Sequence, residues 1–257
     1  MGHIDIYRDF YSYPESAVRT LRVFTPEAYV EDPDRRFPVL YMCDGQNVFA
    51  HPESALFHTW CANWAMDREV HAGTVPPWII VGIDHLPDRF EEYTPWPYPA
   101  RGIQGRAATF VECLVDHIMP FIHRTYRSLA GPEHTALMGA SLGGLVSLYA
   151  GRERPDRIGR IGAVSPTLMW SDYRTFDHWS TRLETFTKIW LDAGREERIW
   201  LDDLELDYAA ITERFYHHLK GLGYADHEVT LLLEPGGNHH EVDWQRRLPA
   251  IFRWLLQ

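Results

Sequence analysis

Short apolar segments bounded by turn residues alternate along this chain with longer segments of helical period. The short segments are typical of buried strands, and the longer ones carry their apolar residues on one helical face. We expect strands over residues 18–24, 38–42, 78–83, 135–139, 158–164, 188–191 and 228–233, and helices over 57–71, 110–126, 142–152, 203–222 and 243–256. This alternation predicts an α/β fold, with a mainly parallel, doubly wound sheet of about seven or eight strands and helices on both faces.

Length and composition favour one globular domain that spans residues 1–257. The chain shows no internal repeat or long linker, and its 45% apolar and 24% charged residues are ordinary for a folded domain. The formal net charge of −11 narrows the range of partners. It argues against nucleic acid and against an anionic membrane surface, because both attract basic patches.

The three cysteines, Cys43, Cys61 and Cys113, are odd in number and scattered, so we expect no disulfide framework. A reducing compartment fits this usage. The first residues do not combine a basic segment with an apolar one, as a secretion signal would. No apolar run approaches the roughly 18 residues of a membrane span. We therefore expect a cytoplasmic protein.

The segment from Gly139 to Gly143 reads Gly-Ala-Ser-Leu-Gly and matches the pattern G-x-S-x-G. A predicted strand precedes it, and a helix-forming stretch follows at once. In such a strand-to-helix turn the serine hydroxyl projects above the sheet, and side chains at the two glycine positions would clash. We predict that Ser141 is a nucleophile. The amide of Leu142, at the helix N-terminus, is a candidate donor of an oxyanion hole.

A serine hydroxyl needs a base to take its proton, and the usual base is a histidine held by a carboxylate. In this type of fold the chain order is serine, acid, histidine. The histidine is expected just after the last strand, where His239 and His240 follow a glycine-rich loop. The acid is expected after the preceding strand, where Asp192, Glu196 and Glu197 lie, and spacing alone does not choose among them.

Four stretches, in consistent order, resemble motifs of the putative-esterase family of α/β-hydrolases. Residues 41–49 are similar to its Y-x-x-DGQN-x-F signature, 139–144 to its G-x-S-x-GG turn, 163–166 to the segment with its Ser-Pro pair, and 236–248 to G-G-x-H-x-E-x-x-W-x-x-R-L. The family includes enterochelin (siderophore trilactone) esterases, S-formylglutathione hydrolase, feruloyl and acetylxylan esterases and mycolyltransferases. The siderophore-esterase branch is the most similar in pattern.

The resemblance implies an α/β-hydrolase fold and selects His239 as the base, because the family's histidine stands five residues before the tryptophan of the last motif. It points to Glu197 as the acid, three residues after Gly194, although some siderophore esterases work with a Ser–His pair alone. In relatives, the residue after the glycine of the DG turn supplies the second oxyanion amide, and here that residue is Gln46. Ser165 is expected to shape the floor of the site.

These features predict a serine carboxylic-ester hydrolase that forms an acyl-enzyme intermediate on a small-molecule ester, with siderophore-type or aromatic esters as candidate substrates. The histidines do not stand at a compact metal-ligand spacing, so we expect neither a metal nor a cofactor. Alternative hypotheses are an S-formylglutathione-type thioesterase, an acyltransferase, and a non-catalytic binding module with the same fold. The sequence predicts no particular oligomeric state.

Aromatic and basic residues near the motifs suggest how a substrate is bound. Trp60, Trp96 and Trp170 are candidates for lining an aromatic cleft, although proline and aromatic residues also serve to rigidify a long loop such as 84–103. Siderophore esterases often meet an anionic ligand with basic residues, and Arg101 and Arg106 are nearby. The acidic balance of the chain gives these two arginines little support as a ligand site.

Overall fold

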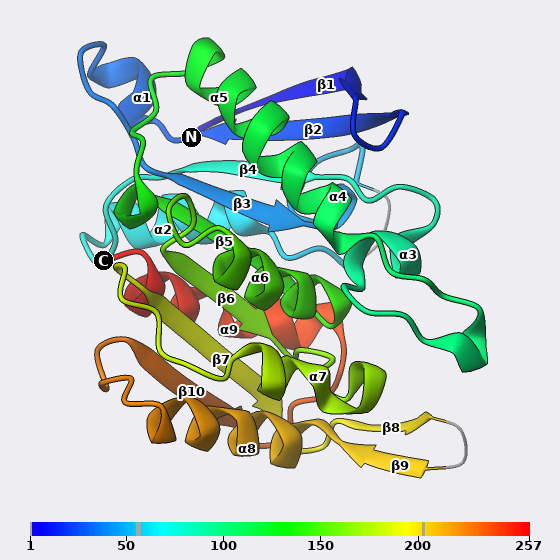
Figure 1. The fold of residues 1–257 in the computed structure, drawn as a ribbon. Coiled ribbons are helices and arrows are strands. Elements are labelled where there is room, and N and C mark those ends of the chain that lie inside the picture. Colours follow the sequence, from blue (N-terminus) through cyan, green and yellow to red (C-terminus); the bar gives the residue numbers. More distant parts are fainter. Residues whose placement is uncertain (1, 55–57, 202–203) are drawn as a thin grey trace.

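The computed structural model describes residues 2–54, 58–201 and 204–257. Its centre is one eight-stranded sheet with helices on both faces (Figure 1). In spatial order the strands are β1 (His3–Ser12), β2 (Ala17–Thr25), β4 (Ile79–Ile83), β3 (Val39–Cys43), β5 (Thr135–Ala140), β6 (Arg160–Val164), β7 (Lys188–Gly194) and β10 (Val229–Glu234). A separate antiparallel ribbon of β8 (Arg198–Leu201) and β9 (Leu204–Asp207) lies beyond the end of β7.

From β4 to β10 every neighbouring pair of strands is parallel, whereas β1 and β2 run antiparallel at the other edge. The register is regular along the centre of the sheet, where Val39 pairs with Thr135 and Ala136 pairs with Arg160. Parallel strands bring their carboxyl ends to one edge of the sheet. In open α/β sheets, ligand sites form at that edge.

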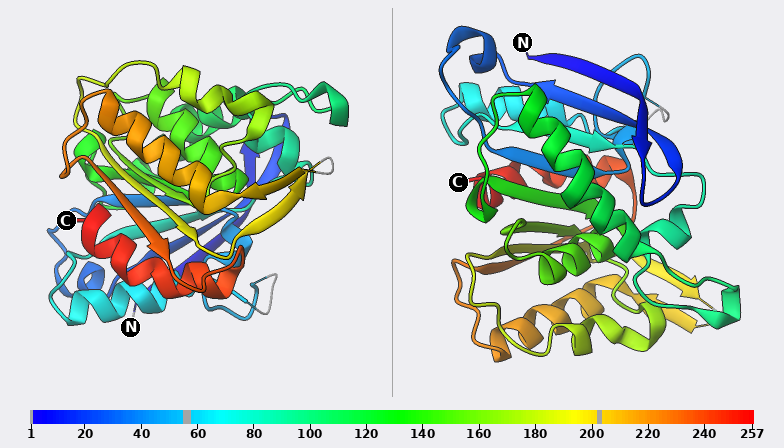
Figure 2. Two further views of the ribbon diagram at one scale, coloured as in Figure 1. Left: turned by 90° about the horizontal axis from the view of Figure 1, so that it is seen from below. Right: turned by 45° about the horizontal axis from the view of Figure 1, so that its top comes forward.

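Nine α-helices of the described residues surround the sheet: α1 (Ala28–Glu31), α2 (Ala62–His71), α3 (Arg89–Tyr93), α4 (Ala107–Glu112), α5 (Met119–Thr125), α6 (Leu142–Glu153), α7 (Trp170–His178), α8 (Tyr208–Gly221) and α9 (Glu241–Leu255). Short 3-10 turns occur at η1 (Gly45–Asn47), η2 (Pro99–Arg101) and η4 (Pro132–His134), and a π-helical segment, η3 (Cys113–Ile118), joins α4 to α5. Helices α6 and α8 cover one face and α9 and α2 the other, as Figure 2 shows in its left view.

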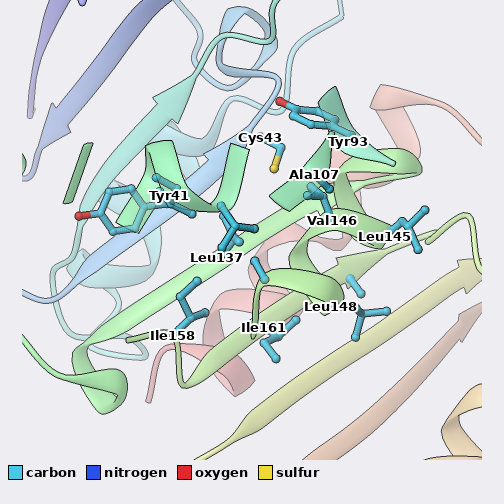
Figure 3. Packing of buried hydrophobic residues seen from close by; sticks show 14 of the residues in the cluster. Tyr41, Cys43, Tyr93, Ala107, Leu137, Leu145, Val146, Leu148, Ile158 and Ile161 are labelled. Atoms are coloured by element: carbon cyan, nitrogen blue, oxygen red, sulfur yellow. The ribbon is translucent and has the colours of Figure 1, made fainter. Parts of the chain in front are cut away.

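The strand β3 shows why the sheet is buried on both faces. Val39, Tyr41 and Cys43 belong to the core cluster under α4 and α6, part of which Figure 3 shows. Leu40 and Met42 point the other way, into the cluster under α2 and α9. Because side chains alternate along a strand, a continuous apolar run of this kind fits a central strand covered by helices on both sides.

The strands expected from the sequence are all present, and the predicted fold class is confirmed. The pattern does not predict β1, because this edge strand mixes polar and apolar residues. The helix predicted over 203–222 is wrong for residues 204–207, which form β9. Helix α8 begins at Tyr208, where the side chain of Asp207 accepts from the Ala210 amide (2.9 Å) and caps the helix.

Two further helices differ from expectation in detail. The segment 110–126 is helical as predicted but is divided into α4, the π-helical segment and α5. The helix expected over 57–71 begins at Ala62, and position 57 lies outside the described residues. Helix α7 carries left-handed backbone angles at three consecutive residues, starting at Ser171, whose hydroxyl donates to the Pro97 carbonyl (2.7 Å).

Candidate active site

Ser141 lies between β5 and α6, at the carboxyl edge of the sheet. Its backbone has φ 59° and ψ −119°, a conformation that residues other than glycine rarely adopt. Such a residue costs on the order of 1–3 kcal/mol and persists only where its surroundings hold it. Here the Ser141 amide donates to the Val164 carbonyl (3.0 Å), and its carbonyl accepts from the Leu145 amide (3.1 Å). This strained strand-to-helix turn is the geometry of a nucleophile elbow.

The glycines around Ser141 are required by close packing. A Cβ on Gly139 would lie 2.8 Å from the carbonyl carbon of Gly143 and 2.9 Å from Cβ of Cys43. Both separations are shorter than real carbon–carbon contacts. Any side chain at position 139 would therefore push the start of α6 away from β5 and displace the serine.

His239 follows β10, and Glu197 follows β7. Nδ1 of His239 lies 3.1 Å from Oε2 of Glu197. The second carboxylate oxygen, Oε1, accepts from the Ser165 hydroxyl (2.7 Å), the Gly194 amide (2.7 Å) and the Arg247 guanidinium (3.0 Å). Three donors on Oε1 fix the plane of the carboxylate and leave Oε2 for the imidazole.

The environment of Glu197 favours its ionised form. Burial alone would raise the pKa of this carboxyl, but hydrogen bonds from His239, Gly194 and Ser165 hold the pKa below its ordinary value. The side chain is therefore a carboxylate at neutral pH. A carboxylate beside Nδ1 can fix the imidazole tautomer and stabilise an imidazolium.

The two other carboxylates at this strand end lie differently. Asp192 is fully buried and accepts from Arg247 (2.7 Å), and burial raises the pKa of Asp192 to about 6. Glu196 is exposed to solvent. Of the three acids that the sequence leaves open, Glu197 is the one whose contact with His239 the structure describes.

The Ser165 hydroxyl links the acid to α9. It donates to Glu197 and accepts from Nε1 of Trp244 (3.1 Å) and from Arg247 (3.0 Å). One donor and two acceptor positions are the full capacity of a hydroxyl group. Ser165 is thus a structural part of the site that holds the carboxylate, and Trp244 also packs edge-on against the imidazole of His239, with ring centroids 5.0 Å apart.

Arg247 is almost fully buried and pairs with Asp192 (2.7 Å), Glu197 (3.0 Å) and Glu234 (2.7 Å). We expect Arg247→Met to lower the free energy of unfolding by about 3–5 kcal/mol, because it leaves buried carboxylates without a counter-charge. Urea unfolding followed by tryptophan fluorescence measures this loss. Arg246→Met, which removes a half-exposed arginine of the same helix, is the control and should cost less than about 1 kcal/mol. Equal losses in the two variants would contradict the expectation.

The neighbouring histidine, His240, has a different role. It is the N-cap of α9, and its Nδ1 accepts from the Val242 amide (3.3 Å). Its side chain is half exposed, and its ring packs against that of His58 (centroids 5.2 Å). Helix capping accounts for this position without any part in chemistry.

The two candidate oxyanion donors lie on turns at the same edge. Leu142 is the first residue of α6, so its amide has no acceptor within the helix. In η1 the Asn47 amide donates to the Asp44 carbonyl (2.8 Å). The Gln46 amide lies one residue before this hydrogen-bonded amide. Asp44 has a left-handed backbone (φ 58°) and a two-pronged ion pair with Arg89 (2.6 and 2.8 Å), which holds this turn in place.

Two cavities of about 270 and 280 Å³ meet at Ser141, and His239 and Arg89 line both of them. The first, which we call the polar cavity, is also lined by Asp44, Gln46, Asn47, Trp60, His85 and Glu241 among others. The second, the apolar cavity, is also lined by Leu142, Phe90, Met169, Trp170, Ile199 and Trp200 among others. Ser141 thus lies between two spaces of different chemistry.

The three tryptophans proposed for a substrate cleft separate in the structure. Trp60 lines the polar cavity and packs against Trp244 (centroids 5.7 Å), and Trp170 lines the apolar cavity. Trp96 lines neither cavity, which corrects the expectation for this residue. Its ring packs against His178 (centroids 5.5 Å), and its carbonyl accepts from Nε1 of Trp170 (3.0 Å). The Trp96 backbone therefore helps to hold the indole of Trp170 in place.

Sequence reasoning did not identify Arg89 or Trp200 as site residues. Arg89 belongs to no motif, and Trp200 lies on the β8–β9 ribbon, which no periodicity predicts. A tryptophan that is 71% exposed is unusual and is a signal that only a structure provides. Of the two arginines considered from the sequence, Arg101 lines the apolar cavity, whereas Arg106 lies outside both cavities and pairs with Asp88 (3.6 Å).

Among residues 2–54, 58–201 and 204–257, no group of three or more His, Cys, Asp or Glu side chains is arranged to hold a metal ion. The same residues contain no helix with the length and apolar character of a membrane span. The three cysteines are free.

A mainly parallel sheet, a strained serine between a central strand and its helix, and a histidine–carboxylate pair at the same edge define the α/β-hydrolase class. The family described as Putative esterase matches residues 16–255, and the chain belongs to this family.

Known proteins similar to the chain include an uncharacterized protein and an esterase. The chain is 23% identical over 242 residues to the uncharacterized protein YbbA of Bacillus subtilis, covering 92% of each. It is 25% identical over 252 residues to an iron(III) enterobactin esterase of Dickeya dadantii, covering 91% of this chain and 51% of that protein. The chain thus spans about half the length of the Dickeya esterase.

Solved structures of esterases share the fold. A ferulic acid esterase superposes with a TM-score of 0.75 at 16% identity, covering 100% of this chain and 98% of the other. The enterobactin esterase of Shigella flexneri superposes with a TM-score of 0.72 at 18% identity, covering 99% of this chain and 59% of the other. At these identities the likeness concerns the fold.

Proposed function

We propose that the protein is a serine carboxylic-ester hydrolase, with Ser141 as nucleophile, His239 as general base and Glu197 as the acid that orients the base. The observation that carries the proposal is the contact of His239 Nδ1 with Glu197 Oε2, made by an imidazole that lines the same two cavities as Ser141. Membership of an esterase family supports the same class of reaction.

In the first half of the proposed reaction, Nε2 of His239 takes the Ser141 proton as Oγ attacks the ester carbonyl. The Oγ–C bond forms, the carbonyl π pair moves to oxygen, and the amides of Leu142 and Gln46 stabilise that oxyanion. When the π pair returns, the C–O bond to the alcohol breaks, His239 gives its proton to the leaving alkoxide, and the acyl-enzyme remains. In the second half His239 activates a water molecule, and collapse of the second intermediate releases the acid and regenerates the serine. Glu197 stabilises the imidazolium in both halves.

The substrate class we propose is siderophore-type or aromatic esters. Relatives of the chain are named enterobactin, salmochelin and feruloyl esterases. The apolar cavity beside Ser141 is lined by Phe90, Trp170 and Trp200, whose rings suit contact with an aromatic group. Arg89, which lines both cavities and is paired with Asp44, adds a guanidinium group beside this wall.

A screen of esters that vary in acyl and alcohol parts tests the substrate class. We expect hydroxybenzoyl or feruloyl esters to have a higher kcat/KM than acetyl or butyryl esters of the same alcohol. Equal values for aromatic and aliphatic acyl groups would contradict the aromatic preference. Faster turnover of S-formylglutathione would favour a thioesterase. Failure of a fluorophosphonate to label the protein would favour a non-catalytic binding module.

Glu197→Gln should lower kcat for p-nitrophenyl acetate by roughly 10⁴-fold, because an amide favours the wrong imidazole tautomer and does not stabilise the imidazolium. Glu196→Gln and Asp192→Asn should each have a much smaller effect, since Glu196 is exposed and Asp192 pairs with Arg247. Initial rates at saturating substrate measure the three effects. A large loss from Glu196→Gln alone would move the acid by one residue. Small losses from all three would favour a Ser–His dyad.

A further inference from the structure

Three hydroxyl groups lie in a row at the edge of the apolar cavity. Oγ of Ser141 is 3.2 Å from Oγ1 of Thr167, and that oxygen is 3.3 Å from the phenol oxygen of Tyr208. Thr167 and Tyr208 are both buried, and both line the cavity together with Ser141 and His239. The mechanism described above uses neither hydroxyl.

The backbone fixes both residues relative to the proposed triad. The Thr167 amide donates to the Ser141 carbonyl (3.1 Å), and the Tyr208 amide donates to the Glu197 carbonyl (3.1 Å). The Tyr208 ring also packs against the imidazole of His239, with centroids 4.7 Å apart. Thr167 is thus tied to the nucleophile turn, and Tyr208 to the acid turn.

Each hydroxyl carries one proton, so the row can point in either of two directions. If Ser141 is to give its proton to His239, its Oγ must accept from Thr167, and Thr167 must accept from Tyr208. A phenol suits the donor end, because it is a stronger acid than an aliphatic hydroxyl. Burial raises the pKa of Tyr208, against the hydrogen bond to Thr167, so the phenol keeps its proton at neutral pH.

We propose that Thr167 is a further catalytic residue of the esterase reaction and that Tyr208 is a positioning residue that acts through it. Oγ1–H of Thr167 donates to Oγ of Ser141 whenever that oxygen gains negative charge. This occurs as His239 takes the serine proton. It occurs again in deacylation, when the Oγ–C bond breaks, its electron pair goes to Oγ, and His239 returns the proton. Neither Thr167 nor Tyr208 loses its proton. The inference rests on the proposed function.

Thr167→Val keeps the shape of the side chain and removes the hydroxyl. We expect kcat for p-nitrophenyl acetate to fall about tenfold with KM nearly unchanged, the effect of losing one hydrogen bond to a charge that develops in the transition state. Thr167→Ser should restore most of the rate. Tyr208→Phe should lower kcat about threefold in the wild type and by much less in the Thr167→Val background, because the row is already broken there.

Two matched controls remove buried hydroxyls outside the row. The hydroxyls of Thr212 and Tyr41 have no hydrogen-bond partner in the described structure, so Thr212→Val and Tyr41→Phe should leave kcat unchanged. Wild-type turnover by Thr167→Val, equal slowness of Thr167→Ser, or full additivity of Thr167→Val with Tyr208→Phe would each overturn the inference and leave the esterase proposal intact. A wild type without turnover or fluorophosphonate labelling would overturn both.

Discussion

Ser141→Ala should abolish ester hydrolysis, with kcat for p-nitrophenyl acetate falling by roughly a millionfold. The serine oxygen is the atom that would form the acyl-enzyme bond, and alanine offers no group to replace it. The substitution keeps Cβ, so the strained backbone at φ 59° is the same in both proteins, and we expect little change in the unfolding temperature. Initial-rate assays measure the loss, and a fluorophosphonate probe should no longer label the variant.

Ser147→Ala is the matched control for the nucleophile. Ser147 lies on α6, the helix that begins directly after Ser141, is fully buried, and donates its hydroxyl to the Gly143 carbonyl (2.7 Å). The Ser147→Ala variant should keep most of the wild-type activity, because the Ser147 hydroxyl faces the helix backbone. More than a few per cent of wild-type activity in Ser141→Ala would remove Ser141 from the role. Equal loss in Ser147→Ala would indicate damage to α6.

His239→Ala should match the loss in the serine variant, while His240→Ala should retain most activity. Without the imidazole the site has no base to take the serine proton, and Glu197 loses the partner of its Oε2. His240 caps α9 instead, so its replacement should lower the free energy of unfolding by about 1 kcal/mol and leave kcat nearly unchanged. Rates at saturating substrate and urea unfolding curves measure the two effects.

The two variants test the prediction that the base stands five residues before Trp244, because His239 and His240 are adjacent in sequence but make different contacts. Loss of activity in His240→Ala with activity kept in His239→Ala would move the base by one residue. Loss in both, together with a large fall in stability of both, would point to damage at the start of α9.

Local sequence determines much of this fold. The strands β3 to β7 carry short apolar runs that end in turn residues, and such runs form buried strands wherever helices can cover both faces. The turn at Ser141 is equally local, because a strand, closely spaced glycines and a helix-forming stretch are all contiguous there. The order of serine, acid region and histidine then follows from the order of the strands.

Position in the sheet determines the elements that the sequence does not reveal. Strand β1 is at the edge of the sheet and only Ser12 of it is buried, so its side chains need no apolar pattern. The β8–β9 ribbon joins no other strand of the described chain, and the start of α8 depends on the Asp207 cap. The place of Trp96 is likewise not predicted by the sequence, because an aromatic residue in a loop has the same sequence pattern whether it faces a cavity or supports its wall.

The sequence by itself determined the fold class and the regions that hold the candidate nucleophile, acid and base, because those signals are carried by consecutive residues. Residue spacing left three carboxylates open and the family motif pointed to Glu197, and only the tertiary structure decided which carboxylate faces His239. Asp192, Glu196 and Glu197 lie within six positions, and Glu197 is the one whose Oε1 is held by Ser165, Gly194 and Arg247 while its Oε2 faces the imidazole. The row from Ser141 to Tyr208 is likewise tertiary. Ser141 and Thr167 follow the parallel strands β5 and β6, whose carboxyl ends lie at one edge of the sheet, and Tyr208 begins α8 directly after the β8–β9 ribbon.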